Sequence, residues 1–146
     1  MMKIFVINGP NLNLLGQREP ELYGSKTLPE IEDDLVKLGS ELGIEVTCFQ
    51  SNHEGELVDI LQDAGQSADG AILNAGAYTH TSVAVRDAVA AIGVPVLEVH
   101  LTNPYAREGF RRVSLLAGVC KGSICGFGRE SYTLALIWFA RNAGTG

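Results

Sequence analysis

The chain has 146 residues, a length typical of one domain, and 46% of them are hydrophobic, which is enough for a substantial core. Its formal net charge of -6 disfavours a general nucleic-acid binder, because such proteins usually carry a basic surface. No apolar run approaches the roughly 20 residues of a membrane-spanning helix, so no membrane partner is expected. We therefore expect a single domain over residues 1–146.

The cysteine content also limits the possibilities. There are three cysteines, Cys48, Cys120 and Cys125, and none is spaced as C-x-x-C. An odd number without that spacing predicts neither a disulfide framework nor a zinc site. We expect small, partly buried hydrophobic side chains and a cytoplasmic location.

Strand and helix patterns alternate along the chain. Residues 3–8 form a short β-branched and aromatic run that ends in the turn signal Asn8-Gly9-Pro10. A loop follows to about residue 25. Thr27 and Glu30 then have the spacing of a capping box, and an apolar stripe at intervals of three and four residues predicts a helix that Gly43 can close.

The rest of the chain continues the alternation. Further strands are expected over 44–50, 70–74, 95–100 and 119–126, and further helices over 54–66, 81–92, 106–116 and 130–142. Five strands separated by helices predict an α/β fold, a doubly wound five-stranded parallel sheet with helices on both faces. We predict the flavodoxin-like order 2-1-3-4-5. Ligands of such sheets bind beyond the carboxyl ends of the strands, at the switch point between strands 1 and 3.

Polar side chains collect at that edge of the predicted sheet. They follow strands 1, 3 and 4 and comprise Asn8, Asn11, Asn13, Asn74, Tyr78, His80, His100, Thr102, Asn103, Arg107 and Arg111. A turn explains any one asparagine by itself. Two of the three histidines, two arginines and several asparagines at one edge instead predict a binding site for a small polar molecule.

Glu98 lies inside the apolar run that forms the fourth strand. A carboxylate in a strand covered on both faces is costly unless it is paired. Because side chains alternate along a strand, Glu98 and His100 point the same way. Glu98 can therefore hold the His100 ring as a general acid or base. A buried structural Glu–His pair is the alternative.

The loop over residues 16–25 carries Arg18 and Tyr23. A neutral tyrosine is a poor base, but a nearby guanidinium favours the phenolate. The glycines and the proline of this loop would let it act as a lid. Two ordinary surface side chains are the simpler reading of Arg18 and Tyr23 taken alone.

Several other motifs are incomplete. The glycines of residues 126–128 lack the third glycine of a dinucleotide fingerprint, and the segment around Lys121 lacks the spacing of a Walker A loop. No cluster with metal-ligand spacing is present in the sequence. None of the four lysines falls clearly at the active edge, which disfavours a Schiff base. We expect neither a metal nor a cofactor.

Three blocks of this sequence resemble type II 3-dehydroquinate dehydratases, almost from end to end. The blocks are GPNLNLLG at 9–16 with REP at 18–20 and YG at 23–24; NAGAYTHTS at 74–82 with RDA at 86–88; and EVH at 98–100 with Asn103, RE at 107–108 and FR at 110–111. The resemblance implies a flavodoxin-like lyase that converts 3-dehydroquinate to 3-dehydroshikimate through an enolate, in the shikimate pathway of aromatic amino-acid biosynthesis.

The resemblance also implies catalytic roles. Tyr23 would abstract a proton from the carbon next to the ketone, and Arg18 would keep Tyr23 ionised. A water held near Asn11 would stabilise the enolate. His100, supported by Glu98, would protonate the departing hydroxyl.

Binding roles follow from the same resemblance. Asn74, His80 and Arg111 would bind ring hydroxyls. The backbone N–H groups of Leu101 and Thr102, with the Thr102 hydroxyl, would hold the carboxylate. The family forms trimers assembled into dodecamers, and Asp87 would reach a neighbouring subunit's site.

Two residues depart from the common pattern of this family. Thr102 stands where many members have serine, and Pro104 stands where a non-proline apolar residue is common. Neither change removes a catalytic group. A non-catalytic flavodoxin-like binding module and a degenerate, structural family member are the alternatives. The presence of Tyr23, Arg18 and His100 argues against the second.

Overall fold

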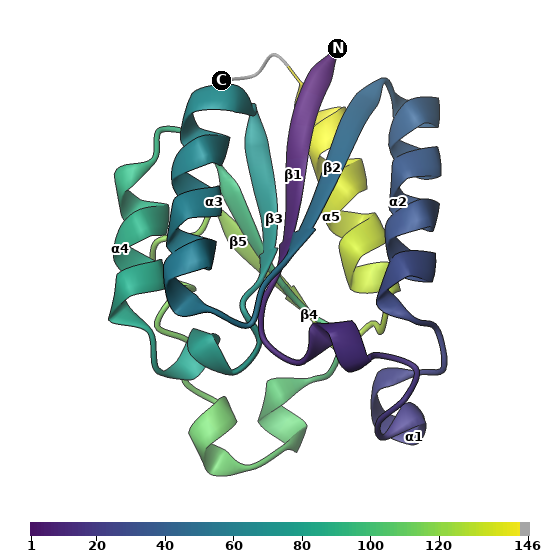
Figure 1. The fold of residues 1–146 in the computed structure, drawn as a ribbon, viewed down its shortest axis with the longest axis vertical. Coiled ribbons are helices and arrows are strands. Elements are labelled where there is room, and N and C mark those ends of the chain that lie inside the picture. Colours follow the sequence, from purple (N-terminus) through teal and green to yellow (C-terminus); the bar gives the residue numbers. More distant parts are fainter. Residues whose placement is uncertain (144–146) are drawn as a thin grey trace.

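A computed structural model describes residues 1–143 and shows a five-stranded parallel sheet (Figure 1). The strands are β1 (Met2–Asn8), β2 (Ile44–Gln50), β3 (Gly70–Asn74), β4 (Val96–His100) and β5 (Gly122–Cys125). Their order is β2-β1-β3-β4-β5, and every pair of neighbours is parallel. The predicted fold class and strand order are therefore confirmed.

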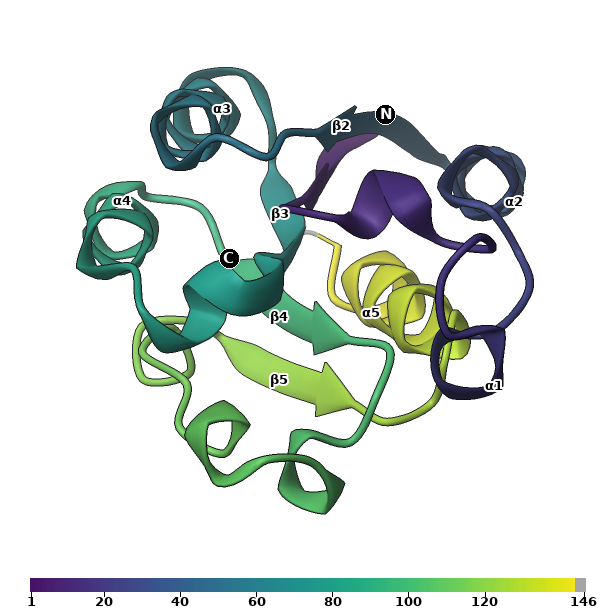
Figure 2. The same ribbon diagram turned by 60° about the horizontal axis from the view of Figure 1, so that its bottom comes forward.

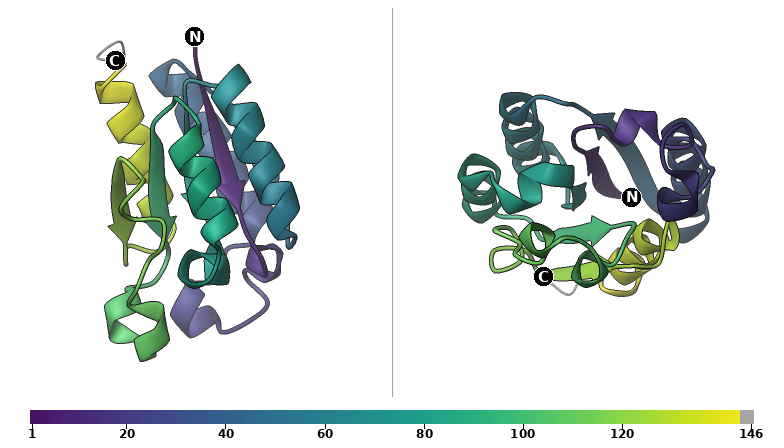
Figure 3. Two further views of the ribbon diagram at one scale, coloured as in Figure 1. Left: turned by 90° about the vertical axis from the view of Figure 1, so that its left-hand side faces the viewer. Right: turned by 90° about the horizontal axis from the view of Figure 1, so that it is seen from below.

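Helices cover both faces of the sheet (Figure 3). On one face, α2 (Leu28–Leu42) and α5 (Glu130–Arg141) pack over Ile4 and Val6 of β1. On the other face, α3 (Glu54–Ser67) and α4 (Val83–Ala91) pack over Ile7. Because side chains alternate along a strand, β1 contributes to two hydrophobic cores. No helix within residues 1–143 is long and apolar enough to cross a membrane.

The predicted start of α2 is confirmed in detail. The Glu30 backbone N–H donates to Thr27 Oγ1 at 3.3 Å, and the Thr27 backbone N–H donates to Glu30 Oε1 at 3.1 Å. This capping box satisfies two amide groups that the first helical turn leaves without partners. Gly43 closes the helix in the left-handed conformation, with φ of 78°.

The expected helix over 106–116 is wrong. The chain forms two short 3-10 turns instead, η3 (Pro104–Ala106) and η4 (Gly109–Arg111). The segment from residue 104 to 113 has no buried apolar stripe that could pack a helix against the sheet. Side-chain caps and turn bonds fix its backbone, beginning with the Tyr105 N–H that donates to Asn103 Oδ1 at 3.0 Å.

Other helix and strand boundaries differ by a few residues from those predicted. Strand β5 begins at Gly122 rather than at residue 119, because the N–H groups of Val119 and Cys120 close a turn onto the Leu116 carbonyl. Helix α4 begins at Val83, after the cap of Ser82 and the 3-10 helix η2 (Gly76–His80). The 16–25 loop contains an unexpected short helix, α1 (Pro20–Tyr23), and η1 (Leu12–Leu14) precedes it.

The three thiols behave as the sequence predicts. Cys48, Cys120 and Cys125 are free and partly buried. Burial raises the pKa of Cys48 and of Cys120 to about 12, so both thiols stay protonated at neutral pH.

All five strands point their carboxyl ends to the same edge, where the connecting loops gather (Figure 2). Asn8 at the end of β1 pairs in register with Asn74 at the end of β3. Directly after them, the Gly9 N–H donates to the Asn74 carbonyl at 2.8 Å. A Cβ atom on Gly9 would lie 2.6 Å from the Ala75 carbonyl oxygen, so only glycine allows the two loops to approach this closely.

Gly9→Ala should therefore lower the free energy of unfolding by roughly 1–3 kcal/mol, as overpacking does against a rigid backbone. Urea unfolding followed by circular dichroism measures the change. Gly93→Ala is the matched control, since a Cβ there meets nothing within 4 Å. The control should stay within about 0.5 kcal/mol of the natural sequence. Equal effects at the two positions would refute the close-approach argument.

Candidate active site

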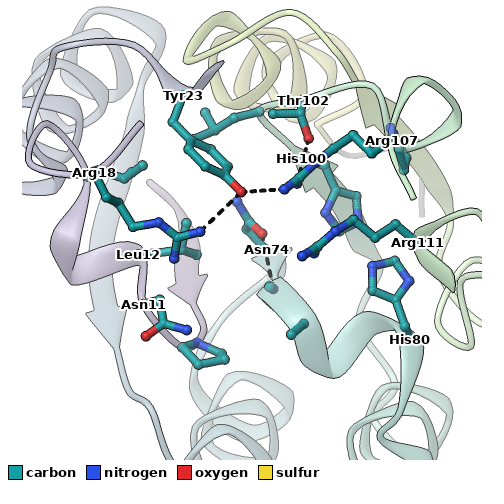
Figure 4. Close-up of a pocket in the computed structure, with 16 residues that line it drawn as sticks. Asn11, Leu12, Arg18, Tyr23, Asn74, His80, His100, Thr102, Arg107 and Arg111 are labelled. Atoms are coloured by element: carbon teal, nitrogen blue, oxygen red, sulfur yellow. Dashed lines mark hydrogen bonds between the residues drawn. The ribbon is translucent and has the colours of Figure 1, made fainter. Parts of the chain in front are cut away.

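A cavity opens at the carboxyl edge of the sheet, above β1, β3 and β4 (Figure 4). Its walls bring together residues from the loops after these three strands. The lining residues are Pro10, Asn11, Leu12, Leu15, Arg18, Tyr23, Asn74, Gly76, Ala77, His80, His100, Leu101, Thr102, Pro104, Arg107 and Arg111. All residues that were expected to have a catalytic or binding role line this cavity except Glu98, which lies behind His100, and Asp87. Four other polar residues predicted at this edge do not line it: Asn8, Asn13, Tyr78 and Asn103.

Tyr23 and Arg18 meet at one wall of the cavity. Helix α1 presents the Tyr23 ring, and the Arg18 guanidinium carbon lies 5.0 Å from the centre of that ring. Arg18 Nη2 donates to the Tyr23 hydroxyl at 3.4 Å, a long hydrogen bond. The expected pairing of these two side chains is therefore present in the structure.

Arg107 is a stronger partner of Tyr23 than Arg18, and the sequence did not single it out for this position. Its Nη2 donates to the Tyr23 hydroxyl at 2.7 Å, across 84 positions of sequence, and its guanidinium lies 5.3 Å from the ring centre. Arg107 Nη1 also donates to Thr102 Oγ1 at 3.3 Å. Two guanidinium groups thus flank one phenol oxygen.

The buried Glu98 carboxylate lies behind His100 and has three hydrogen-bond donors. His100 Nε2 lies 2.9 Å from Glu98 Oε2. The hydroxyl of Ser114 donates to Oε2 and that of Ser123 donates to Oε1, each at 2.6 Å. Because a carboxylate only accepts, His100 Nε2 carries a proton in this contact. The other ring nitrogen, Nδ1, is then the one that can exchange a proton.

The environment of Glu98 keeps it ionised. The side chain is 2% exposed, and burial by itself would raise its pKa. The hydrogen bonds from His100, Ser114 and Ser123 outweigh that effect, so that the pKa of Glu98 lies below its usual value of 4.5. The buried charge is thus compensated, as a buried charge must be.

The predicted hydroxyl-binding residues lie on the remaining walls. His80 Nδ1 donates to the Val113 carbonyl at 2.7 Å, which leaves Nε2 as the acceptor in the neutral ring. Arg111 Nε donates to Glu108 Oε2 at 2.7 Å. Asn74 Oδ1 accepts from the Gly76 N–H at 3.2 Å. These contacts fix each polar head group at the cavity before any ligand binds.

Asn11 has an unusual backbone conformation for a non-glycine residue. Its φ is 68°, in the left-handed region that asparagine tolerates better than most residues. The Asn11 N–H donates to Asn52 Oδ1 at 3.0 Å, which holds this turn at the mouth of the cavity.

Asp87 does not reach the cavity of its own chain. It lies on the surface of α4, 65% of its side chain is exposed, and its carboxylate pairs with Arg86 at 3.1 Å. Within residues 1–143, no group of three His, Cys, Asp or Glu side chains is arranged to hold a metal ion.

Comparison with known proteins gives the family. The model of the family described as Dehydroquinase class II matches residues 2–140. The chain belongs to this family. A 3-dehydroquinate dehydratase of Pelotomaculum thermopropionicum is 58% identical over 144 residues, which is 99% of this chain and 100% of that protein. The prediction of a type II 3-dehydroquinate dehydratase, a carbon–oxygen hydro-lyase, is thus confirmed.

Solved structures agree with this membership of the class II dehydroquinases. The type II dehydroquinase of Butyrivibrio crossotus has a TM-score of 0.92 at 44% identity, covering 96% of this chain and 97% of that one. The type II dehydroquinase of Propionibacterium acnes has a TM-score of 0.94 at 36% identity, covering 97% of each chain. The architecture described above is therefore that of the family.

The pKa of Glu98 predicts how stability depends on pH. Because this pKa is lower in the folded than in the unfolded chain, the carboxylate contributes stability that is complete above 4.5 and is lost as the pH falls through the folded value. Glu98→Gln should lower the free energy of unfolding at neutral pH by roughly 1–3 kcal/mol. The difference from the natural chain should shrink below pH 4.5.

Urea unfolding over a series of pH values measures both quantities. Glu41→Gln, on the exposed surface of α2, is the control and should change the free energy at neutral pH by less than about 0.5 kcal/mol. A Glu98→Gln deficit that grows on acidification would contradict the assigned direction of the shift.

Proposed function

We propose that this chain converts 3-dehydroquinate to 3-dehydroshikimate through an enolate, without a Schiff base, as a step of the shikimate pathway that leads to aromatic amino acids. Residues 1–146 would form one catalytic domain. The observation that carries the proposal is one cavity with a base on one wall and an acid on another. The base is the Tyr23 hydroxyl between two guanidinium groups, and the acid is His100 backed by Glu98.

The first step is removal of a proton from the carbon next to the substrate ketone. Tyr23 would act as a phenolate, with its negative charge stabilised by Arg107 at 2.7 Å and by Arg18 at 3.4 Å. The electrons of the broken C–H bond move to the ketone oxygen and form an enolate. A water held near Asn11 would donate a hydrogen bond to that oxygen.

The second step is loss of water. The enolate re-forms the ketone and pushes out the neighbouring hydroxyl, and His100 would give that hydroxyl a proton so that it leaves as water. The Glu98 carboxylate stabilises the imidazolium that this step requires, since it accepts from Nε2 at 2.9 Å. The carbon–carbon double bond of the product forms in conjugation with the ketone.

The remaining cavity residues would hold the substrate in place. Asn74, His80 and Arg111 offer amide, imidazole and guanidinium groups to the ring hydroxyls. The backbone N–H groups of Leu101 and Thr102 and the Thr102 hydroxyl would bind the carboxylate. Arg107 Nη1 bonds to Thr102 Oγ1 at 3.3 Å, which supports a hydroxyl oriented at this wall. Pro104 is the first residue of the turn η3, and its fixed φ supports a stiff loop after Thr102.

A Schiff base has no support among the described residues. The cavity lining includes no lysine. Lys26 is the lysine next to the Tyr23 wall, and its Nζ is bound to Asp34 Oδ2 at 2.6 Å. Borohydride with substrate should therefore leave activity intact.

Tyr23→Phe should lower the turnover number by roughly 10²–10⁴-fold, the usual contribution of a general base. Substrate binding should be nearly unchanged, because phenylalanine retains the ring. The appearance of the enone absorbance after addition of 3-dehydroquinate measures turnover, and calorimetry measures binding.

Leu22→Ala is the matched control, because Leu22 lies on the same short helix with its side chain 42% exposed. It should keep turnover within about threefold of the natural chain. Full activity in Tyr23→Phe would remove Tyr23 from the mechanism. No enone from the natural chain would favour the non-catalytic binding module.

We also propose a cytoplasmic homo-oligomer of trimers assembled into a dodecamer, in which Asp87 completes the site of a neighbouring subunit. The exposure of Asp87 on α4, outside its own cavity, supports this proposal.

Co-expression of two inactive variants tests the shared site. Asp87→Ala and Tyr23→Phe would each lack one half of every site, but a mixed trimer would contain sites with both residues intact. Random mixing should restore about one quarter of the activity of the natural chain, from the symmetry of a closed ring. Hybrid activity no higher than that of the two separate variants would place both residues in the same subunit's site.

A further inference from the structure

A chain of three buried polar side chains lies beneath the cavity. Tyr132 on α5 is completely buried, and its hydroxyl accepts a hydrogen bond from Asn74 Nδ2 at 3.0 Å. The same hydroxyl donates to Asn8 Oδ1. Asn8 and Asn74 end the two paired strands β1 and β3, so the Tyr132 hydroxyl links both strand ends to the helix packed behind them.

The hydrogen bonds among these three side chains allow one assignment of donors and acceptors. Asn74 Oδ1 accepts from the Gly76 N–H, so Nδ2 must be the end of the amide that faces Tyr132. The Tyr132 hydroxyl has a single proton. Because this hydroxyl accepts from Asn74, it donates its own proton to Asn8. Burial raises the pKa of Tyr132 well above its usual value, so the hydroxyl keeps its proton at neutral pH. Rotation of the Asn74 amide would break both of its hydrogen bonds.

The Asn74 side chain is the only one of the three that reaches the cavity, among the residues that the structure describes. Its Nδ2 has a second hydrogen, and its Oδ1 has a second lone pair, beyond those used by Tyr132 and Gly76. These are the groups that a ring hydroxyl would meet. Figure 4 shows the Asn74 amide in the middle of the site, among Tyr23, His100 and Arg111.

The hydroxyl of Tyr132 has no evident use in packing. It lies in an apolar core with Leu136 and Phe139 of the same helix, where phenylalanine would bury as well and would need no partners. Among the described residues, Asn8 Nδ2 is buried without a hydrogen-bond partner in the protein. What the three residues achieve together is a fixed orientation of Asn74.

We propose that Tyr132 is a positioning residue for the dehydration: its buried hydroxyl, anchored on Asn8, orients the Asn74 amide toward the substrate ring. This inference rests on the proposed function, in which Asn74 binds a ring hydroxyl.

Tyr132→Phe tests the inference, because it removes one oxygen and keeps the ring. A binding contact made equally in the ground state and the transition state changes KM and leaves kcat alone. We therefore expect KM for 3-dehydroquinate to rise about tenfold, with kcat within about twofold of the natural chain. A loss of folded protein would give the opposite pattern, a lower kcat at unchanged KM.

A double-mutant cycle shows whether the effect passes through Asn74. In an Asn74→Ala background, Tyr132→Phe should change KM by less than about twofold, because the group that it positions is gone. Leu136→Val, one turn further along α5 in the same core, is the control for lost stability and should leave KM within about twofold. The unfolding midpoints of all variants are measured in the same buffer.

Each outcome decides between the alternatives. An unchanged KM in Tyr132→Phe, or a rise of equal size with and without Asn74, would overturn the positioning role. Absence of turnover by the natural chain would instead refute the proposed function. If Tyr132→Phe fails to fold, Asn8→Ala replaces it. That variant removes the acceptor of the Tyr132 hydroxyl proton and should raise KM about threefold. An unchanged KM would overturn the inference.

Discussion

The Glu98 carboxylate is buried in the fourth strand of the sheet, and the surrounding structure has to compensate its charge. A buried carboxylate is unstable without donors, and here they come from three separate segments: His100 on the same strand, Ser123 on β5 and Ser114 after the turn η4. The charge therefore holds the last strand and the 104–116 segment against β4. It also holds the His100 ring at the cavity, so that one interaction serves both the fold and the site.

The opposite wall of the site is built by a different principle. Tyr23 lies in a loop of the first strand, and Arg107 lies 84 residues later in the loop of the fourth strand. Each side chain also has a hydrogen bond within its own loop, Tyr23 with Arg18 and Arg107 with Thr102. Their 2.7 Å contact closes the site from two directions, and Arg18 adds a second positive group to the same phenol oxygen. The region of positive charge around the Tyr23 hydroxyl is thus a tertiary feature.

The carboxyl ends of the strands position these two walls relative to each other. Gly9 lets the loops after β1 and β3 come into contact, and the left-handed backbone of Asn11 turns the chain across the mouth of the cavity. Beneath them, Asn8, Tyr132 and Asn74 form a polar connection between the sheet and α5. The floor of the carboxyl edge is therefore held by hydrogen bonds that join β1, β3 and α5.

The sequence by itself determined the parallel sheet, its strand order and the residues that gather at its carboxyl edge. Alternating apolar periodicity and turn chemistry are local properties, and the handedness of crossovers then leaves few topologies. The Glu98–His100 pair could also be predicted, because a two-residue spacing on a strand places both side chains on one face. The short turns over 104–111 could not, since no local pattern distinguishes them from a helix there.

Only the tertiary structure decided which side chains complete the site. Arg107 as the close partner of Tyr23, Ser114 and Ser123 as donors to Glu98, and Tyr132 beneath Asn74 all depend on contacts between segments far apart in sequence. Serine, arginine and tyrosine are also common in places without any such role, so their identity alone gave no signal. Their positions follow from how helices and loops pack on the finished sheet, which one strand's pattern does not encode.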